Sequence, residues 1–386
     1  MTQAIYSPRV PWLFPELERR LLGLLRAQGD LTVSTTMKAF VMREIGKVAV
    51  QQKPIPEPGP TDAIVKTTAA LICTSDTHTV AGAIGPREDL TLGHEAVGRV
   101  HRLGSAVSGF REGDRVLVGA ITPCFQCTNC QRGWTSQCTQ MLGGWKFANM
   151  KDGNMAEYFH VNNAAGNLAR IPDALSDEQA VYCADMLSTG FMAAEHADIP
   201  MGGSVAVFAL GPIGLMAVVG ARLCGAGLII GVDNVPSRLQ LARQYGCDQT
   251  VNFKERDPLK TILDLTDGQG VDSAIEAYGG RITFEACIKV TRPGGTISNV
   301  GYHGEGDSVP IPRLAWGVGM SDKTIRTGLC PGGAERMRRL LRLLEHDRVN
   351  PLPLTTHRFS FDQVERAFRM MQTKEDGMIK PLILFP

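Results

Sequence analysis

The chain has 386 residues, enough for two domains of ordinary size, and its 40 basic and 39 acidic residues give a formal net charge of +1. No basic block is long enough to follow a phosphate backbone, so nucleic acid is not expected as a partner. No apolar run approaches about 20 residues, which excludes a membrane-spanning helix. Ten cysteines and the lack of a signal peptide favour a reducing, cytoplasmic location.

The first 36 residues differ from the rest of the chain. Residues 15–28 carry apolar side chains at helical spacing. Arginines in this stretch are typical of a transit peptide, whereas its two glutamates are not. Chain ends are usually poorly ordered unless other contacts hold them, so we expect residues 1–36 to be an extension without a catalytic role.

The remaining chain divides by its pattern of elements. Residues 37–188 contain short strands separated by turns, such as 63–67, 96–103 and 114–118, which indicates a β-rich domain. From residue 189 to 328, apolar strands at 204–208, 228–232, 271–277 and 295–300 alternate with helical segments, which predicts a parallel sheet with right-handed crossovers. Residues 329–386 contain a helix at 336–345 and a strand at 382–385 that we expect to return to the first domain.

Four cysteines form a short cluster with the spacing C-x2-C-x2-C-x7-C. Such spacing suits four thiolates that converge on one structural zinc ion. Two disulfides are the alternative, but so short a span is hard to cross-link pairwise without strain. The predicted ligands of this closed site are Cys124, Cys127, Cys130 and Cys138.

A dinucleotide-binding turn follows the strand predicted at 204–208. Residues 209–214 join that strand to a helix, which is the context of a G-x-G-x-x-G turn, although Ala209 replaces the first glycine. Gly211 lets the backbone approach a pyrophosphate, and Gly214 lets the helix pack on the strand. The residues of the turn predicted to bind the cofactor are Gly211, Pro212, Ile213 and Gly214.

Cofactor choice is predicted from Asp233, at the end of the next strand. A carboxylate there accepts hydrogen bonds from the adenosine ribose hydroxyls and repels a 2′-phosphate. Asn234 and Val235 offer no cation to a phosphate, so NAD is favoured over NADP. The alternative is an acid that is merely exposed at a strand end. Further predicted cofactor contacts are Thr189, Tyr302 and Lys380.

A second, open zinc site is predicted from separated segments. Cys73 and His94 supply sulfur and nitrogen, and Asp185 supplies a carboxylate just before a Ser-Thr-Gly turn. Cys183 competes for this third position on chemistry alone. Glu95 is expected to bind the ion directly or to support its ligands.

The open site also predicts a reaction. A free fourth position lets an alcohol oxygen bind zinc and lose its proton near neutral pH, as zinc does for water. Ser75 and His78 follow Cys73 closely and complete a relay, with the hydroxyl at the metal and the imidazole toward solvent.

Taken together, these motifs resemble the zinc-dependent medium-chain alcohol dehydrogenases. The similarity covers Met37 to the C-terminus. It rests on the four-cysteine cluster and on Cys73-Thr-Ser-Asp-Thr-His78, Gly93-His-Glu95 and Gly211-Pro-Ile-Gly214. The resemblance implies an α/β fold with a GroES-like β-rich catalytic domain and a Rossmann doubly wound parallel-sheet domain.

Three further segments, residues 144–149, 184–190 and 328–333, resemble the bacterial secondary-alcohol branch of that family. This branch implies an aspartate as the third zinc ligand, hence Asp185. It also implies that Trp145, Leu329 and Cys330 border the substrate pocket. Its thermophilic members use NADP and carry Gly-Ser-Arg where this chain has Asp233-Asn-Val, and some of them lack the structural cysteines. Cofactor and substrate preference are therefore not carried over from it.

The sequence predicts a zinc-dependent, NAD-linked alcohol dehydrogenase with two zinc ions per chain. It would transfer hydride between a small secondary or primary alcohol and NAD, giving the ketone or aldehyde. The alternatives are a polyol or aldehyde-adduct dehydrogenase of the same family and, more remotely, a non-catalytic protein that binds zinc and a nucleotide. The expected partners are a small alcohol or carbonyl substrate and identical subunits in a homodimer or homotetramer.

Overall fold

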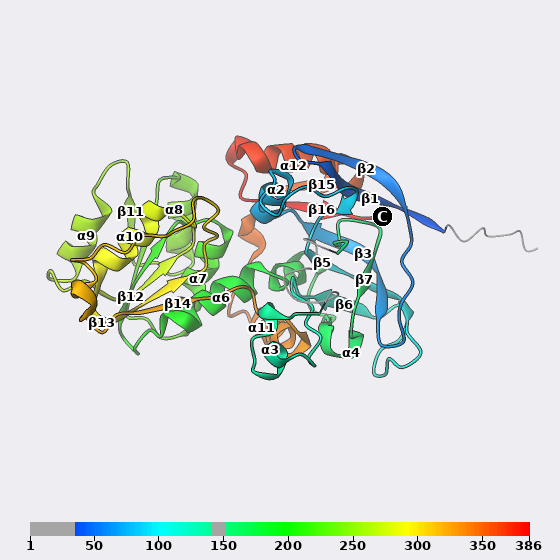
Figure 1. Ribbon diagram of the computed structural model, residues 1–386, viewed down its shortest axis with the longest axis horizontal. Helices are drawn as coiled ribbons and strands as arrows, with labels where there is room; N and C mark the ends of the chain where they lie inside the picture. The colour runs from blue at the N-terminus through cyan, green and yellow to red at the C-terminus, as the bar shows by residue number, and fades with distance from the viewer. Residues whose placement is uncertain (1–34, 141–150) are drawn as a thin grey trace, which may run out of the picture. The chain divides into compact units, whose positions relative to one another are not determined.

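The computed structural model describes residues 35–140 and 151–386, which are drawn as a coloured ribbon in Figure 1. The chain divides into two units, residues 1–36 and residues 37–386, and the second unit is described below. The predicted helical stripe at residues 15–28 and the predicted pocket residue Trp145 lie outside the described residues.

A seven-stranded sheet is the framework of the β-rich part. Its strand order is β15-β16-β3-β5-β6-β8, with β7 also paired to β3. The C-terminal strand β16 runs antiparallel to β3, with Leu382 opposite Leu71, so the end of the chain completes this sheet. Its strands are β3 (Ala63–Leu71), β5 (Glu95–Leu103), β6 (Arg115–Val118), β7 (Tyr158–Val161), β8 (Leu168–Arg170), β15 (Thr355–Ser360) and β16 (Lys380–Leu384).

Smaller elements cover this sheet. A three-stranded sheet in the order β2-β1-β4 consists of β1 (Thr36–Glu44), β2 (Lys47–Pro54) and β4 (Leu90–Thr91). Side chains from both sheets and from the last helix, including Phe40, Phe159 and Phe368, form one buried core. The helices of this part are α2 (Thr74–Val80), α3 (Thr128–Gln131), α4 (Ala164–Asn167), α5 (Asp177–Ala180), α11 (Ala334–Glu345) and α12 (Val364–Thr373).

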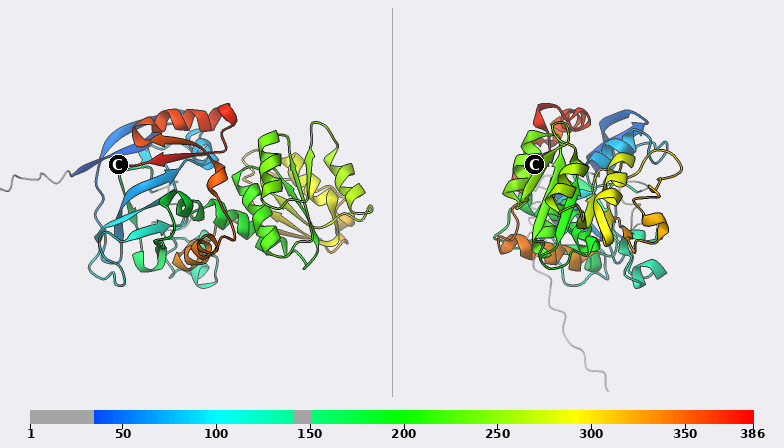
Figure 2. Two further views of the ribbon diagram at one scale, coloured as in Figure 1. Left: turned by 180° about the vertical axis from the view of Figure 1, so that it is seen from behind. Right: turned by 90° about the vertical axis from the view of Figure 1, so that its left-hand side faces the viewer.

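The second part is a six-stranded parallel sheet in the order β11-β10-β9-β12-β13-β14. Its central strands are apolar and buried, as expected when helices cover both faces of a parallel sheet, which Figure 2 shows. The strands are β9 (Ser204–Phe208), β10 (Leu228–Asp233), β11 (Gln249–Asn252), β12 (Val271–Glu276), β13 (Thr291–Asn299) and β14 (Thr324–Thr327). The helices are α6 (Met186–Ala197), α7 (Pro212–Leu223), α8 (Pro236–Gln244), α9 (Pro258–Leu265) and α10 (Arg281–Val290).

The chain order of the strands reverses between β9 and β12. In doubly wound sheets, ligands bind outside the carboxyl ends of the strands at such a switch point. Helix α6 packs tightly on α7 near this point. Gly190 permits this close approach, since a Cβ there would lie 2.5 Å from Met216 Cβ. This packing fixes the position of the N-terminus of α6, where a predicted zinc ligand lies. Among the described helices, none is long and apolar enough to cross a membrane.

Candidate active site and metal centres

Four predicted metal ligands from separate segments converge in the structure. Cys73 precedes α2, and Asp185 precedes α6. His94 lies directly before β5, and Glu95 is the first residue of that strand. Their ligand atoms all lie within 4.8 Å of one another. A thiolate, an imidazole and carboxylates are ordinary zinc ligands. Glu95 Oε2 is buried and has no hydrogen-bond partner in the described part of the chain, so the donor set fits a cation at its centre.

His94 is oriented by Asp76, a residue that sequence reasoning missed. His94 Nδ1 lies 3.4 Å from Asp76 Oδ1, and His94 Nε2 lies 3.5 Å from Asp185 Oδ2. Asp76 also accepts hydrogen bonds from the backbone N–H groups of Cys73, at 2.8 Å, and Gly93, at 3.2 Å. A proton on Nδ1 leaves the Nε2 lone pair for a metal. Asp76 could have been recognised in the sequence as a helix-capping residue, because an acid at the third position of a helix is typical of a capping box.

The cluster carries an excess of negative charge. Burial opposes a charged imidazole, but Asp76 and Asp185 together raise the pKa of His94 well above its usual range. Carboxylates that favour a proton in this position favour a bound cation for the same reason.

Lys380 pairs with Glu95. Its Nζ lies 2.6 Å from Glu95 Oε1, and both side chains are fully buried. Burial raises the pKa of Glu95 to about 7, and the nearby Lys380 opposes that rise. Removing either partner would leave an uncompensated charge in the interior. This geometry brings Lys380 to the metal cluster through Glu95, and its predicted contact with the cofactor stays a prediction.

Asp185 and Cys183 have different surroundings. Cys183 lies in the hydrophobic core, outside the ligand cluster, and burial raises the pKa of its thiol. Asp185 Oδ1 accepts a 2.5 Å hydrogen bond from the hydroxyl of Thr189, and its Oδ2 faces His94. Thr189, which is also a predicted cofactor contact, is buried, with 8% of its surface exposed. The structure therefore brings Asp185 into the candidate ligand cluster and leaves Cys183 in the core.

The proposed relay residues lie on α2 beside this cluster. Ser75 Oγ lies 3.4 Å from His94 Nε2, and both Ser75 and His78 are exposed at the surface of the described chain. Partial burial and the positive charge of Lys374 lower the pKa of His78, which keeps the imidazole neutral near pH 7. The ring of Tyr302 stands 5.8 Å from that of His78, centroid to centroid. A neutral imidazole in this place can accept a proton that leaves the site.

The four cysteines of the second cluster surround the short helix α3, and their sulfur atoms lie within 4.8 Å of one another. Cys124 Sγ accepts the backbone N–H of Cys127 at 3.3 Å, and the backbone N–H of Cys124 donates to Cys138 Sγ at 3.4 Å. Backbone N–H groups, first that of Thr139, lower the pKa of Cys127 to about 5, whereas burial raises the pKa of Cys130 to about 12. All ten cysteines of the chain are free thiols. This geometry fits a tetrahedral zinc site, and none of the four cysteines is disulfide-bonded in the described chain.

The cysteine loop contacts the segment that is predicted to border the substrate pocket. The backbone N–H of Gly332 donates to Thr135 Oγ1 at 3.3 Å. Cys330 is buried with its Sγ 3.9 Å from the carbonyl oxygen of Ala184, and Leu329 is 40% exposed. The pocket segment is thus supported by the cysteine loop on one side and by the turn before α6 on the other.

The dinucleotide turn joins β9 to α7. Gly211 caps the helix, Pro212 is its first residue, and a Cβ at Gly211 would meet nothing within 4 Å. The N-terminus of α7 is therefore open to a phosphate. A Cβ at Gly214 would lie 1.9 Å from the carbonyl oxygen of Ala209, so only glycine fits there. Ala209 has a φ of 71°, a conformation that glycine adopts more readily, and Ile213 packs partly against the core.

Asp233 ends β10 beside this turn, and backbone N–H groups hold its carboxylate. Oδ2 accepts from Leu210 at 2.7 Å, and Oδ1 accepts from Asn234 at 2.7 Å and from Val235 at 3.0 Å. Arg238 on α8 has its Nη1 3.8 Å from Asp233 Oδ2. The carboxylate is therefore fixed at the carboxyl edge of the sheet with one guanidinium beside it.

Lys374 is a second residue that sequence reasoning missed. It follows α12 with a φ of 55°, and its Nζ donates to Thr74 Oγ1 at 3.1 Å, next to the predicted ligand Cys73. Burial, assisted by the like charge of Lys380, lowers the pKa of Lys374 to about 8. No local pattern distinguishes this lysine from the exposed lysines of the chain.

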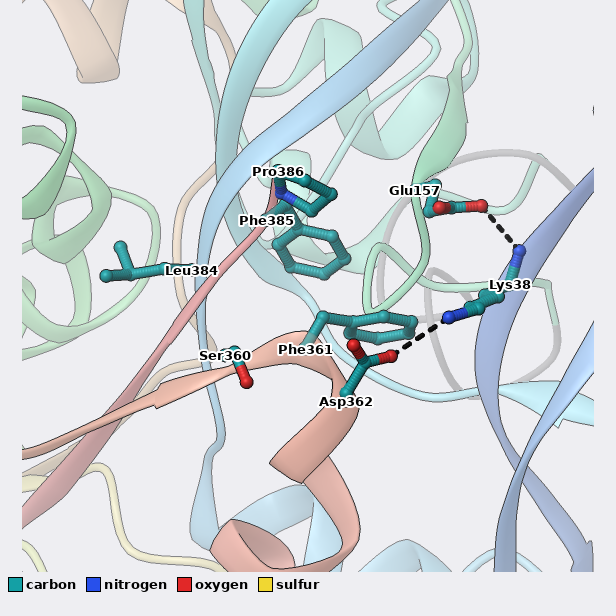
Figure 3. Close-up of a pocket in the computed structure, with 8 residues that line it drawn as sticks. All are labelled: Lys38, Glu157, Ser360, Phe361, Asp362, Leu384, Phe385 and Pro386. Carbon is teal, nitrogen blue, oxygen red and sulfur yellow. Dashed lines mark hydrogen bonds and ion pairs between the residues drawn. The ribbon is translucent and has the colours of Figure 1, made fainter.

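A separate cavity of about 320 Å³ lies near the C-terminal strand (Figure 3). The rings of Phe361 and Phe385 stack beside it with centroids 4.5 Å apart. Lys38 donates its backbone N–H to Glu157 and its ammonium to Asp362 at the same place. None of the predicted site residues lines this cavity.

Known proteins share this architecture. Residues 59–173 match the alcohol dehydrogenase GroES-like domain, and residues 212–346 match the zinc-binding dehydrogenase family. An NADP-dependent isopropanol dehydrogenase from Thermoanaerobacter brockii is 50% identical over 350 residues, covering 90% of this chain and 99% of that protein. An alcohol dehydrogenase from Cupriavidus necator is 44% identical over 362 residues, covering 90% and 98%. The structure of alcohol dehydrogenase TADH from Thermus sp. ATN1 superposes with a TM-score of 0.82 at 32% identity and covers 91% of this chain and 100% of that one.

The β-rich part with its thiol, imidazole and carboxylate cluster, together with the parallel dinucleotide-binding sheet, defines a zinc-dependent dehydrogenase. The chain belongs to the family of zinc-binding alcohol dehydrogenases. The predicted fold class, a GroES-like domain plus a Rossmann domain, is confirmed, and so is the predicted activity of an alcohol dehydrogenase.

Proposed function

We propose that the protein oxidises small secondary alcohols to ketones, and catalyses the reverse reduction, with NAD as the hydride acceptor. The observation that carries the proposal is the convergence of Cys73, His94 and Asp185 beside Ser75 and His78. The substrate class is supported by the relative named for isopropanol, which covers 90% of this chain.

The chain's own residues prepare the site for this reaction. A zinc ion held by Cys73, His94 and Asp185 would lower the pKa of an alcohol hydroxyl, and the nicotinamide would accept the hydride. The Ser75 hydroxyl, beside His94, is placed to take up the alcohol proton, and His78 is placed to pass it to solvent. Glu95, paired on one oxygen with the buried Lys380, lies beside these three residues and supports them.

The choice of NAD rests on Asp233. Its carboxylate is fixed by three backbone N–H groups at the sheet edge, where a 2′-phosphate would meet a like charge. Asn234 and Val235 add no positive charge. The relative named as NADP-dependent weighs against this choice. Arg238, 3.8 Å from Asp233, is the cation that would bind a 2′-phosphate if the enzyme used NADP.

Steady-state kinetics with both nucleotides test the cofactor proposal. Wild-type kcat/KM with NAD should exceed that with NADP by about tenfold or more, because like-charge contacts cost several kcal/mol. Asp233→Gly combined with Val235→Arg should turn the preference toward NADP. Asp248→Asn is the matched control, since Asp248 also accepts a backbone N–H, that of Ile229 at 2.8 Å, but precedes its strand. A wild-type preference for NADP would refute the proposal, and Arg238→Ala would then show whether the guanidinium causes it.

A substrate panel tests the substrate class. It contains 2-propanol, 2-butanol, ethanol, a hexitol and a thiol adduct of formaldehyde, with the corresponding carbonyl compounds for the reverse direction. We expect the highest kcat/KM for the secondary alcohols and their ketones. A hexitol or the adduct as the best substrate would favour the polyol or aldehyde-adduct alternative. Binding of nucleotide without turnover of any alcohol would favour the non-catalytic alternative.

We also propose that residues 37–188 and 329–386 form the catalytic domain and that residues 189–328 form the nucleotide-binding domain. Both metal clusters are proposed to hold zinc, which gives two ions per chain. The ten free thiols support a reducing, cytoplasmic location. Elemental analysis of purified active protein should find about two zinc ions per chain. One ion or none would refute the two-site proposal.

A homodimer or homotetramer is the proposed assembly. Leu314 and Met320, before the edge strand β14, are 77% and 80% exposed. Exposed apolar side chains beside an unpaired strand edge are typical of a surface that another chain covers. Light scattering should give a mass of two or four times the 41.8 kDa chain, and a monomer would refute the proposal.

A further inference from the structure

Glu276 is a buried carboxylate that belongs to neither metal cluster and has no role in the proposed reaction described above. It ends β12 with no solvent exposure. Its Oε1 accepts the backbone N–H groups of Tyr278, at 3.1 Å, and Gly279, at 2.9 Å, and the hydroxyl of Thr283 at 2.6 Å. Its Oε2 accepts the Gly279 N–H at 3.0 Å. Burying a carboxylate is costly unless hydrogen bonds compensate it, so these bonds fix the loop at residues 277–280 to the start of α10.

A second loop, residues 300–304, closes around the same carboxylate. A Cβ at Gly301 would lie 2.2 Å from Glu276 Oε2, and a Cβ at Gly279 would lie 2.2 Å from the carbonyl oxygen of Tyr302. His303 joins the cluster, with its Nε2 2.8 Å from Asn299 Oδ1 and 3.9 Å from Glu276 Oε2. The two loops therefore fit together only because glycine occupies both contact points and the carboxylate lies between them.

These loops lie at the carboxyl edge of the parallel sheet. Glu276 is in register with Phe208, which ends β9, on one side and with Asn299, which ends β13, on the other. The dinucleotide turn begins immediately after Phe208, at the switch point between β9 and β12. Ligands bind outside the carboxyl edge at such a point. The loop at 300–304 also carries Tyr302, whose ring contacts His78 of the proposed relay.

The two ends of the cofactor are thus separated along this edge. The adenosine end belongs beside Asp233 on β10, and the pyrophosphate belongs at the N-terminus of α7. The reactive ring has to approach the metal cluster, and Tyr302 brings the loop at 300–304 to that side. Glu276 holds this loop and is not part of the adenosine site.

We propose that Glu276 is a positioning residue for the nicotinamide end of the cofactor. It holds the loops at 277–280 and 300–304 so that their backbone and Tyr302 present a fixed surface to the nicotinamide ring beside His78. This inference rests on the proposed function only in requiring a nicotinamide dinucleotide. It does not depend on whether the cofactor is NAD or NADP.

Binding of two ligands to three variants tests the inference. The ligands are ADP-ribose, which lacks the nicotinamide, and whichever reduced dinucleotide the wild type binds more tightly. Glu276→Ala removes every acceptor and should weaken the reduced dinucleotide at least about tenfold, as expected for lost hydrogen bonds to a charged group. ADP-ribose should bind within about twofold of wild type, since its contacts lie elsewhere on the edge. Glu276→Gln keeps one carbonyl acceptor, so a smaller loss of about threefold is expected.

Glu285→Gln is the matched control. Glu285 lies on α10, next to the same loop, but its carboxylate binds Arg281 at the surface. This variant should bind both ligands as the wild type does. Zinc content should be unchanged in all variants. Should Glu276→Ala fail to fold, Glu276→Gln carries the test with the same comparison. Equal weakening of both ligands, or no weakening of either, would overturn the positioning role. A wild type that binds neither reduced dinucleotide would instead refute the proposed function.

Discussion

The support of His94 by Asp76 gives a prediction with a magnitude. Asp76→Asn removes the negative charge that faces His94 Nδ1 at 3.4 Å but keeps the size of the side chain. The remaining amide oxygen can still accept one of the two backbone N–H groups, from Cys73 or Gly93. A hydrogen bond to a charged group contributes about 1.5–3 kcal/mol, and about 1.4 kcal/mol corresponds to tenfold in affinity. We therefore expect zinc to bind the catalytic cluster roughly 10–100-fold more weakly, the range found for other residues that support metal ligands.

Competition with a chelator of known affinity measures this effect. The zinc of the cysteine cluster should remain bound in the variant, because Asp76 does not contact it. Asp362→Asn is the control, since Asp362 is an exposed carboxylate that pairs with Lys38. It should leave the affinity of both sites unchanged. Wild-type zinc affinity in Asp76→Asn would contradict the role assigned to this carboxylate, and loss of both metals would indicate general unfolding.

Three further predictions concern the metal ligands and the relay. Asp185→Asn should remove most activity and much of the catalytic zinc. Cys183→Ala should only lower the stability of the fold, by about 1–2 kcal/mol for a small cavity. If Cys183→Ala lost more zinc than Asp185→Asn, the two roles would have to be exchanged. Cys138→Ser should lower the melting temperature, because structural zinc stabilises folding directly. It should also raise KM for the alcohol, because the cysteine loop contacts the predicted pocket segment at Gly332. An unchanged melting temperature would argue against a structural ion. Burial and the positive charge of Lys374 lower the pKa of His78, so kcat/KM for alcohol oxidation should begin to fall at a lower pH than an ordinary histidine would give. Lys374→Met removes a like charge, so it should move this acid limb to higher pH, and a shift to lower pH would exclude His78 as the titrating group.

Much of the fold follows from local patterns in the sequence. The predicted strands at 204–208, 228–232 and 271–277 correspond to β9, β10 and β12, and the helix predicted at 336–345 corresponds to α11 within two residues. These elements are long, apolar or strongly periodic, so burial and propensity agree. The strand predicted at 295–300 starts earlier, at Thr291, because pairing with β12 extends β13 past Pro293 and Gly294.

Both candidate metal clusters could also be predicted, the cysteine cluster from its short spacing and the other from ligand types that zinc binds in motifs resembling a known family. Their supporting residues could not be predicted in the same way. Lys380 reaches Glu95 only through the pairing of β16 with β3 and β3 with β5, and no local pattern specifies that contact across 285 residues. Glu276 is likewise one of two acids in β12, and the sequence gives no sign of its role until the structure places the glycines of two loops against it.

Transfer of deuterium tests the central claim most directly. The protein is incubated with its preferred oxidised dinucleotide and 2-propanol that carries deuterium at C2, and the reduced cofactor is analysed by mass spectrometry. We predict one deuterium per reduced nicotinamide in the wild-type protein. His94→Ala should form no reduced cofactor while it keeps its fold and the zinc of the cysteine cluster. Reduced cofactor without deuterium, or undiminished transfer by His94→Ala, would contradict a zinc-dependent hydride transfer at the cluster of Cys73, His94 and Asp185.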